Sequence, residues 1–183
     1  MVPAGYMAKR VAARPDWLRA EHVSRISSVS GCMSEDFADY INFWKHNGYW
    51  LFNSPEAIAA IAREKQIDLS GTVLFFYAVH ELQFDAGQWM PFASEPSFPT
   101  AVSVPEAKVL EGYDVVSFTS QTSPEHSPLS CNALAAEVET NSRCLLKSFE
   151  QTRTLLENGT FNNSEPGPYR IFAVYSVAWP GGT

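Results

Sequence analysis

The segment from Ser123 to Asn132 gathers the side chains that nucleophilic chemistry uses. Pro124 and Pro128 fix the backbone dihedral φ and remove hydrogen-bond donors, so we expect a shaped loop rather than a regular helix or strand. Catalytic and binding residues are often mounted on such loops. The loop carries a carboxylate, an imidazole, a thiol and an amide: Glu125, His126, Cys131 and Asn132.

These side chains suggest a small Cys/His-dependent enzyme as one hypothesis. Cys131 would be the nucleophilic thiolate, His126 its base, and Asn132 or Glu125 would orient the imidazole. Catalytic partners usually converge from distant segments, so three other histidines are equally eligible as the base: His22, His46 and His80. The alternative is structural, with Cys131 beginning a short helix as a buried side chain while His126 and Glu125 brace the loop.

The cysteines predict neither a disulfide framework nor a metal centre. They are odd in number and widely spaced, at Cys32, Cys131 and Cys144, which favours a reducing compartment. Structural zinc sites usually show ligand pairs about two to four residues apart, and no two cysteines here have that spacing. We therefore expect no metal and no cofactor.

The charge balance favours a protein partner over a nucleic acid. The chain has 13 Lys and Arg residues against 20 Asp and Glu residues, a formal net charge of −7. Binding to phosphates needs clustered positive charge, which the sequence lacks. An acidic surface instead attracts a basic protein, and exposed Tyr and Trp side chains can anchor such a contact. The candidate partner-binding residues are Glu35, Asp36, Asp39, Tyr49, Trp50 and Glu125.

The preferred hypothesis is therefore a non-enzymatic protein-binding domain that recognises a basic partner, as inhibitors and immunity proteins do. The enzyme centred on Cys131 is the alternative. The two differ in one chemical property, because a catalytic thiolate reacts rapidly with electrophiles at neutral pH and a buried structural thiol does not.

Length and composition indicate one globular domain. With 183 residues, 45% of them hydrophobic, the chain can build a single core, which we place at residues 17–180. Residues 1–16 follow no apolar period and predict a flexible arm, and residues 181–183 form a short tail. The sequence has no secretory leader and no run of about 18 apolar residues, so we expect a cytoplasmic location and no membrane association.

Serine residues mark the expected helix starts. Ser54 precedes Pro55, and Ser148 stands three positions before Gln151 as in a capping box. Ser34 precedes two acidic residues and a helical pattern of aromatic residues, which predicts another helix. A fourth, short helix is expected over residues 130–138.

The expected strands are rich in Val, Phe and Tyr. Residues 72–84 form the longest such segment, and its first half is apolar on both faces, which predicts a central strand. Asp85-Ala86-Gly87 predicts a hairpin turn, and Pro91 then predicts an edge strand. Further strands are expected at 49–52, 113–118 and 169–179.

Together these elements predict an α+β fold. We expect a mainly antiparallel, or mixed, sheet of about four to six strands with about three or four packed helices. The sequence shows no internal repeat.

Overall fold

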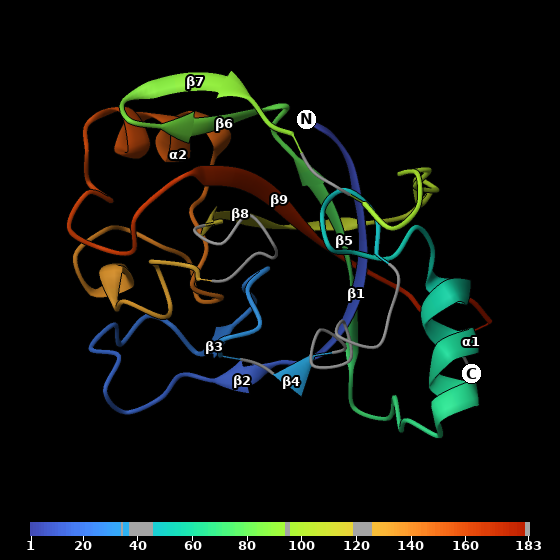
Figure 1. The fold of residues 1–183 in the computed structure, drawn as a ribbon. Coiled ribbons are helices and arrows are strands. Elements are labelled where there is room, and N and C mark those ends of the chain that lie inside the picture. Colours follow the sequence, from blue (N-terminus) through green and yellow to red (C-terminus); the bar gives the residue numbers. More distant parts are fainter. Residues whose placement is uncertain (34, 37–45, 94–95, 119–125, 182–183) are drawn as a thin grey trace.

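The fold is built on one antiparallel sheet with two α-helices (Figure 1). The computed structural model describes residues 1–33, 35–36, 46–93, 96–118 and 126–181. The main sheet has seven strands in the order β4-β1-β5-β9-β6-β7, with β8 paired to β9, and β2 and β3 form a separate two-stranded ribbon. The strands are β1 (Val2–Arg10), β2 (Ala12–Ala13), β3 (Arg25–Ile26), β4 (Glu35–Asp36), β5 (Val73–Val79), β6 (Leu82–Asp85), β7 (Gln88–Pro91), β8 (Val109–Ser117) and β9 (Tyr169–Val177).

The predicted central strand and hairpin are confirmed. β5 lies between β1 and β9, and its residues 74–79 are buried, because both of its faces are apolar and both are covered. Asp85 pairs with Gln88 across the next turn, so Ala86 and Gly87 are the two turn residues, with φ values of 46° and 80°. This left-handed pair matches the twist of a hairpin. β7, which ends at Pro91, is an edge strand.

The predicted number of helices is wrong. Among the described residues there are two α-helices, α1 (Pro55–Lys65) and α2 (Phe149–Glu157), and one short 3-10 helix (Leu134–Ala136). Both α-helices start as expected. The Ser54 hydroxyl accepts a hydrogen bond from the Ala57 amide at 3.3 Å, and the Ser148 hydroxyl accepts one from the Gln151 amide at 3.1 Å.

Two expected helices fail for different reasons. In the segment 130–138, Ala133 has a left-handed φ of 61°, so only the 3-10 turn of residues 134–136 forms. In the segment that begins at Ser34, Glu35 and Asp36 form strand β4, because pairing with the edge of β1 overrides the helix-start signal. Ser34 and residues 37–45 lie outside the described residues.

Residues 2–10 form strand β1 instead of a flexible arm. Residues 4–9 of this strand are buried, and the strand pairs with β5 over most of its length. The interior accepts even Lys9, which is 1% exposed. The composition of residues 1–16 predicted a flexible arm, because Lys, Arg and Pro interrupt any apolar period. Residues 2–10 are ordered as a strand because they pair with β5.

The chain contains an internal repeat that the sequence analysis missed. β1 pairs with β5 in the same register as β8 pairs with β9, and both pairs are interrupted by an irregularity just before a glycine, Gly5 or Gly112. Corresponding pairs are Val2–Val79 and Val109–Ser176, Met7–Phe75 and Asp114–Phe172, and Lys9–Val73 and Val116–Arg170.

An asparagine-centred turn recurs in both halves. The Asn47 side-chain amide donates to the Ala4 carbonyl at 2.8 Å, and its carbonyl oxygen accepts from the amides of residues 49 and 51. The Asn141 amide donates to the Glu111 carbonyl at 2.7 Å, and its oxygen accepts from the amides of residues 143 and 145. Each asparagine thus fixes a tight turn against the strand that carries the glycine.

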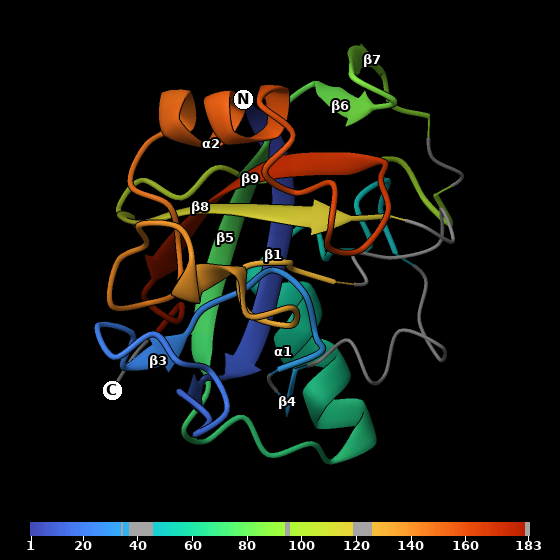
Figure 2. The ribbon, with the colours of Figure 1, turned by 90° about the vertical axis from the view of Figure 1, so that its left-hand side faces the viewer.

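We call β1, the Asn47 turn, α1 and β5 the first repeat, and β8, the Asn141 turn, α2 and β9 the second repeat. β5 and β9 pair antiparallel at the centre, so the repeats are related by an approximate twofold axis near the Tyr77–Val174 pair. Figures 1 and 2 both place α1 and α2 at opposite ends of the sheet, as this axis requires. The repeat escapes detection in the sequence because few residues are shared and the connecting segments differ in length.

The two glycines test this equivalence. A Cβ atom at Gly5 would lie 2.6 Å from the Leu51 Cβ, and one at Gly112 would lie 2.7 Å from the Leu145 Cβ, at φ values of +144° and +146°. We expect Gly5→Ala and Gly112→Ala each to lower the free energy of unfolding by about 3 kcal/mol or more, measured by urea denaturation. Gly87→Ala is the control for a positive φ without crowding, since its φ is +80° and no described atom lies within 4 Å of the added Cβ. Equal losses in all three variants would contradict the prediction.

Candidate functional site: a thiol centre between the repeats

The fold joins two cysteines that are distant in the sequence. Cys32 and Cys131, 99 positions apart, form a disulfide with a Cα–Cα distance of 6.6 Å. A ring nitrogen of His126 lies within 4.8 Å of both sulfur atoms. Cys32 is exposed, and Cys131 and His126 are half-buried, so solvent reaches the pair from the Cys32 side. We call these three residues the thiol centre.

Two loops of similar sequence deliver the cysteines. Ser28 stands four positions before Cys32, and Ser127 stands four positions before Cys131. The Ser28 hydroxyl donates to one carboxylate oxygen of Asp114 at 2.7 Å, and the Ser127 hydroxyl donates to the other at 2.6 Å. One carboxylate on β8 therefore holds both cysteine loops together.

A buried cation fixes the first of these loops. The Lys9 ammonium donates to three consecutive backbone carbonyls, those of residues 28, 29 and 30, at 2.7–2.9 Å. Lys9 and Asp114 occupy neighbouring parts of the buried interior and are 1% and 0% exposed. Burial raises the pKa of Asp114 above its ordinary value, while the hydrogen bonds from Ser127, Ser28 and Val29 and the charge of Lys9 act in the opposite direction.

Two hydroxyl groups lie close to the Cys131 sulfur atom. The Ser30 hydroxyl accepts a hydrogen bond from the Cys32 amide at 3.2 Å and lies 3.9 Å from the Cys131 sulfur. The Ser130 hydroxyl lies 3.8 Å from the same sulfur. The Cys131 amide donates to the Ser127 carbonyl at 2.8 Å, which tightens the second loop. Hydroxyl donors near sulfur can stabilise a thiolate after the disulfide is reduced.

The arrangement supports thiol–disulfide chemistry more directly than single-cysteine catalysis. The inference from wide cysteine spacing was wrong, because the fold, and not the sequence, brings Cys32 to Cys131. When reduced, two thiolates and an imidazole at this spacing also form a set of three ligands of the kind that zinc accepts, a grouping that the cysteine spacing did not predict.

The predicted catalytic residues are only partly brought together. A ring nitrogen of His126 lies within 4.8 Å of the Cys131 sulfur. The Asn132 side-chain amide instead donates a hydrogen bond to the Glu165 carboxylate at 3.2 Å, so it does not take the predicted role of orienting the imidazole. The His126 backbone carbonyl accepts the Ser117 amide at 2.9 Å, which anchors His126 to the end of β8. Glu125 lies outside the described residues.

The predicted partner-binding aromatics are engaged within the fold. Trp50 stacks on His46 with ring centroids 3.4 Å apart, and the Arg170 guanidinium lies 5.0 Å from the Tyr49 ring centroid. Both aromatics are half-buried. Glu35 and Asp36 lie on β4, and Asp39 is outside the described residues, so a partner-binding role for this set stays a prediction.

Cys32, Asp114 and Lys9 belong to the site but were not predicted from the sequence. The signal for Cys32 was available, since a serine precedes both Cys32 and Cys131 by four positions. Asp114 and Lys9 lie within segments that read as an ordinary strand and a loose arm, so only the tertiary structure identifies them. The third cysteine, Cys144, is buried, and desolvation raises its pKa to about 12.

Comparisons of the chain with protein-family models, with curated proteins and with solved structures find no match. Among the described residues, no helix is both long enough and apolar enough to cross a membrane.

The thiol centre predicts a pattern of cysteine reactivity. Before reduction, the native protein should have no thiol that reacts rapidly with Ellman's reagent at neutral pH, because the only free cysteine is Cys144, whose pKa is raised to about 12. After mild reduction two thiols should react, with exposed Cys32 preceding half-buried Cys131. Mass spectrometry of the labelled peptides assigns them. Rapid labelling of Cys32 or Cys131 before reduction would contradict the prediction.

Asp114 predicts a pH dependence of stability. Its folded-state pKa is raised, so its stabilising contribution is complete below the unfolded-state pKa of about 4 and is lost as the pH rises through the folded-state pKa. Asp114→Asn should cost about 1–3 kcal/mol through poorer hydrogen bonding to Ser28 and Ser127. The stability advantage of the natural protein over Asp114→Asn should shrink with rising pH in urea unfolding experiments. If the stability advantage of the natural protein instead grew with pH, the hydrogen bonds and the Lys9 charge would outweigh the effect of burial on the Asp114 pKa.

Proposed function

We propose that the protein functions through a redox-active disulfide, Cys32–Cys131, which exchanges with an external thiol. The observation that carries this proposal is the exposed disulfide with an imidazole within 4.8 Å of both sulfurs. Thiol–disulfide exchange needs one sulfur that an external thiolate can reach and a group that can donate a proton to the sulfur that leaves as a thiolate. Cys32 provides the first and His126 the second.

The exchange proceeds in two balanced steps. An external thiolate attacks the Cys32 sulfur, a bond forms between these two sulfurs, and the Cys32–Cys131 bond breaks. Cys131 leaves as a thiolate and receives a proton from the His126 imidazolium. A second external thiolate then attacks the external sulfur of the mixed disulfide, releasing an external disulfide and the Cys32 thiolate, which is protonated by water. Two external thiols are oxidised and the protein disulfide is reduced to a dithiol.

The scaffold keeps the two sulfurs close in the reduced state. Asp114 accepts hydrogen bonds from both cysteine loops, and the Lys9 ammonium holds the first loop by three carbonyls. These contacts do not depend on the disulfide. Preorganised thiols reoxidise readily, so reduction should be reversible, as a functional disulfide requires.

The protein-binding domain predicted from the sequence is a second proposal. It rests on the formal net charge of −7, which would speed association with a basic partner. A protein partner found by pull-down should then bind more slowly as salt is raised. Its predicted anchors Tyr49 and Trp50 already pack inside the molecule, so the geometry favours the thiol proposal.

Exchange with glutathione tests the proposal. The natural protein should equilibrate reversibly with mixtures of reduced and oxidised glutathione, followed by mass spectrometry after acid quenching. His126→Gln should slow reduction by about tenfold or more, because the leaving Cys131 thiolate loses its proton donor. The matched control is His22→Gln, whose ring nitrogen contacts the Thr140 hydroxyl at 2.8 Å, away from the thiol centre.

Two results would overturn the proposal. Equal reduction rates in His126→Gln and His22→Gln would remove the role of the imidazole. Loss of the folded state in the variant with both Cys32→Ser and Cys131→Ser would show that the disulfide is a structural crosslink, whereas the contacts of Asp114 and Lys9 predict that this variant stays folded.

A further inference from the structure

A second site lies between the two repeats, at a pocket of about 230 Å³ that is lined by residues from both halves of the chain. One wall is apolar and is formed by Val11, Val73 and Phe75. The opposite wall is polar and charged, with residues from β3, the Asn141 turn and the ends of β8 and β9. None of these residues belongs to the thiol centre, so the pocket is independent of the redox proposal.

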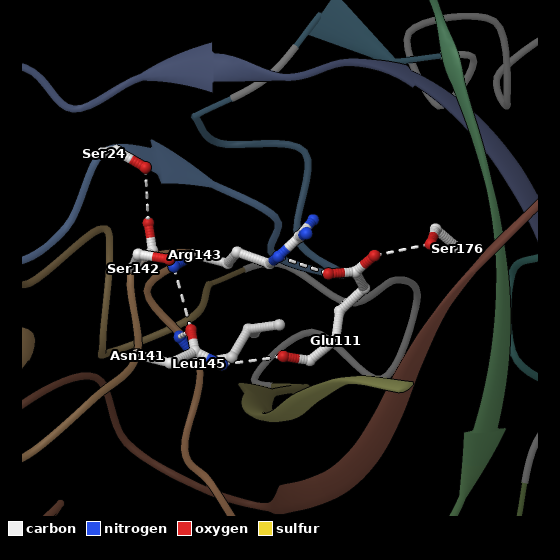
Figure 3. A network of polar contacts seen from close by, with 7 residues as sticks. All are labelled: Ser24, Glu111, Asn141, Ser142, Arg143, Leu145 and Ser176. Carbon is white, nitrogen blue, oxygen red and sulfur yellow. Dashed lines mark hydrogen bonds and ion pairs between the residues drawn. The ribbon is translucent and has the colours of Figure 1, made fainter. Parts of the chain in front are cut away.

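The polar wall is held rigidly by its own hydrogen bonds. Glu111 is 7% exposed, and one of its carboxylate oxygens accepts a hydrogen bond from the Ser176 hydroxyl at 2.5 Å. The other oxygen forms an ion pair with the Arg143 Nε atom, and Figure 3 shows this chain of contacts between β8, the turn and β9. The Asn141 amide fixes the Glu111 backbone, and Ser24 donates to the Ser142 carbonyl at 3.0 Å. Arg143 therefore points in a fixed direction.

The wall keeps hydrogen-bonding capacity that this network does not use. Ser27 is 1% exposed and lines the pocket, and its hydroxyl has no hydrogen-bond partner among the residues that the structure describes. In Figure 3 the terminal nitrogens of Arg143 lie on the side of the guanidinium away from its contact with Glu111. Arg25 adds a second guanidinium from β3. Two cations against one carboxylate leave a surplus positive charge, and an unpartnered buried hydroxyl calls for a ligand atom.

The position related to this pocket by the approximate twofold axis shows what can occupy such a space. There, the guanidinium of Arg170 enters the equivalent space and lies 3.6 Å from the centroid of the Phe92 ring. At the pocket, the equivalent of Arg170 is Val73 on β5, which is too short to fill the space. The space at Val73 is therefore open, whereas the protein fills the equivalent space with the side chain of Arg170. Other equivalent pairs are Ala4 and Glu111, Tyr49 and Arg143, Val79 and Ser176, and Phe75 and Phe172.

We propose that this pocket binds a small organic carboxylate with a short apolar body. The carboxylate accepts hydrogen bonds from the terminal nitrogens of Arg143 and Arg25 and from the Ser27 hydroxyl. The apolar body packs on Val73 and Phe75. Arginine favours carboxylates because its planar fork matches their two oxygens. The pocket volume restricts the ligand to a small molecule, since drug-sized ligands need roughly 300 Å³ or more.

Titration with benzoate, phenylacetate and 3-methylbutanoate tests the proposal, with binding measured by calorimetry and by NMR chemical shifts. We expect saturable binding of at least one of them at concentrations up to about 10 mM. Benzamide, the neutral isostere of benzoate, should bind at least tenfold more weakly, because it cannot accept charge-assisted hydrogen bonds at both positions. Inorganic phosphate should also bind more weakly, because it has no apolar body.

Variants locate the binding to this pocket. Arg25→Gln changes an exposed residue, so it should fold and should weaken binding by about tenfold. Arg153→Gln is the matched control, because it removes an equal charge from an exposed arginine paired with Glu157 on α2. Arg143→Gln alone leaves the buried Glu111 unpaired, so it is combined with Glu111→Gln to remove both charges together. This double variant should also lose the ligand.

The proposal is overturned if none of the three carboxylates binds, if benzamide binds as tightly as benzoate, or if Arg25→Gln and Arg153→Gln bind alike. The variant with Cys32→Ser and Cys131→Ser separates this proposal from the redox proposal, since it abolishes exchange and should leave carboxylate binding unchanged.

Discussion

One buried carboxylate, Asp114, organises the centre of this molecule. Its two oxygens receive the hydroxyl groups of Ser28 and Ser127, which belong to different repeats of the chain. Burying a carboxylate at 0% exposure would cost much free energy if it had neither an opposite charge nearby nor hydrogen-bond donors. The two serines, the Val29 amide and the nearby Lys9 cation supply these contacts. The same contacts bring the two cysteine loops together. The hydrogen bonds of one interior carboxyl group thus also fix where the two cysteine loops meet.

The approximate twofold symmetry shows which residues have diverged. Strand positions that only pack keep small or apolar side chains in both repeats, as at Ala8 and Val115. At four equivalent pairs of positions, a charged residue occurs in one repeat and an apolar residue in the other. Lys9 corresponds to Val116, Asp114 to Met7, Glu111 to Ala4 and Arg170 to Val73. The pocket includes two of these asymmetric positions, Glu111 and Val73, and two others, Lys9 and Asp114, hold the cysteine loops of the thiol centre. Because buried charges cost stability, each needs a compensating contact, and that contact is what makes each site distinct.

The sequence carries much of the fold and little of the site. Ser54 and Ser148 cap the two α-helices as predicted, and the two-sided apolar pattern of β5 identified a central strand, because both signals are local. The strand nature of residues 2–10 and of Glu35–Asp36 was missed, because each depends on a partner strand far along the chain. The loop around Cys131 was recognised by composition. Its partner Cys32 was not, because 99 residues separate the two and only the tertiary structure closes that distance.

The antiparallel pairing of β5 with β9 determines how the two repeats can differ in sequence. Each repeat supplies its own neighbour for its central strand, β1 for β5 and β8 for β9, so the contact between repeats is self-complementary. This is the interface of a symmetric homodimer, enclosed within a single polypeptide. Because both repeats lie in one polypeptide, their sequences need not be identical. A substitution in a true homodimer would appear in both copies. Here β9 carries Arg170, while the equivalent position on β5 is Val73, which leaves a pocket.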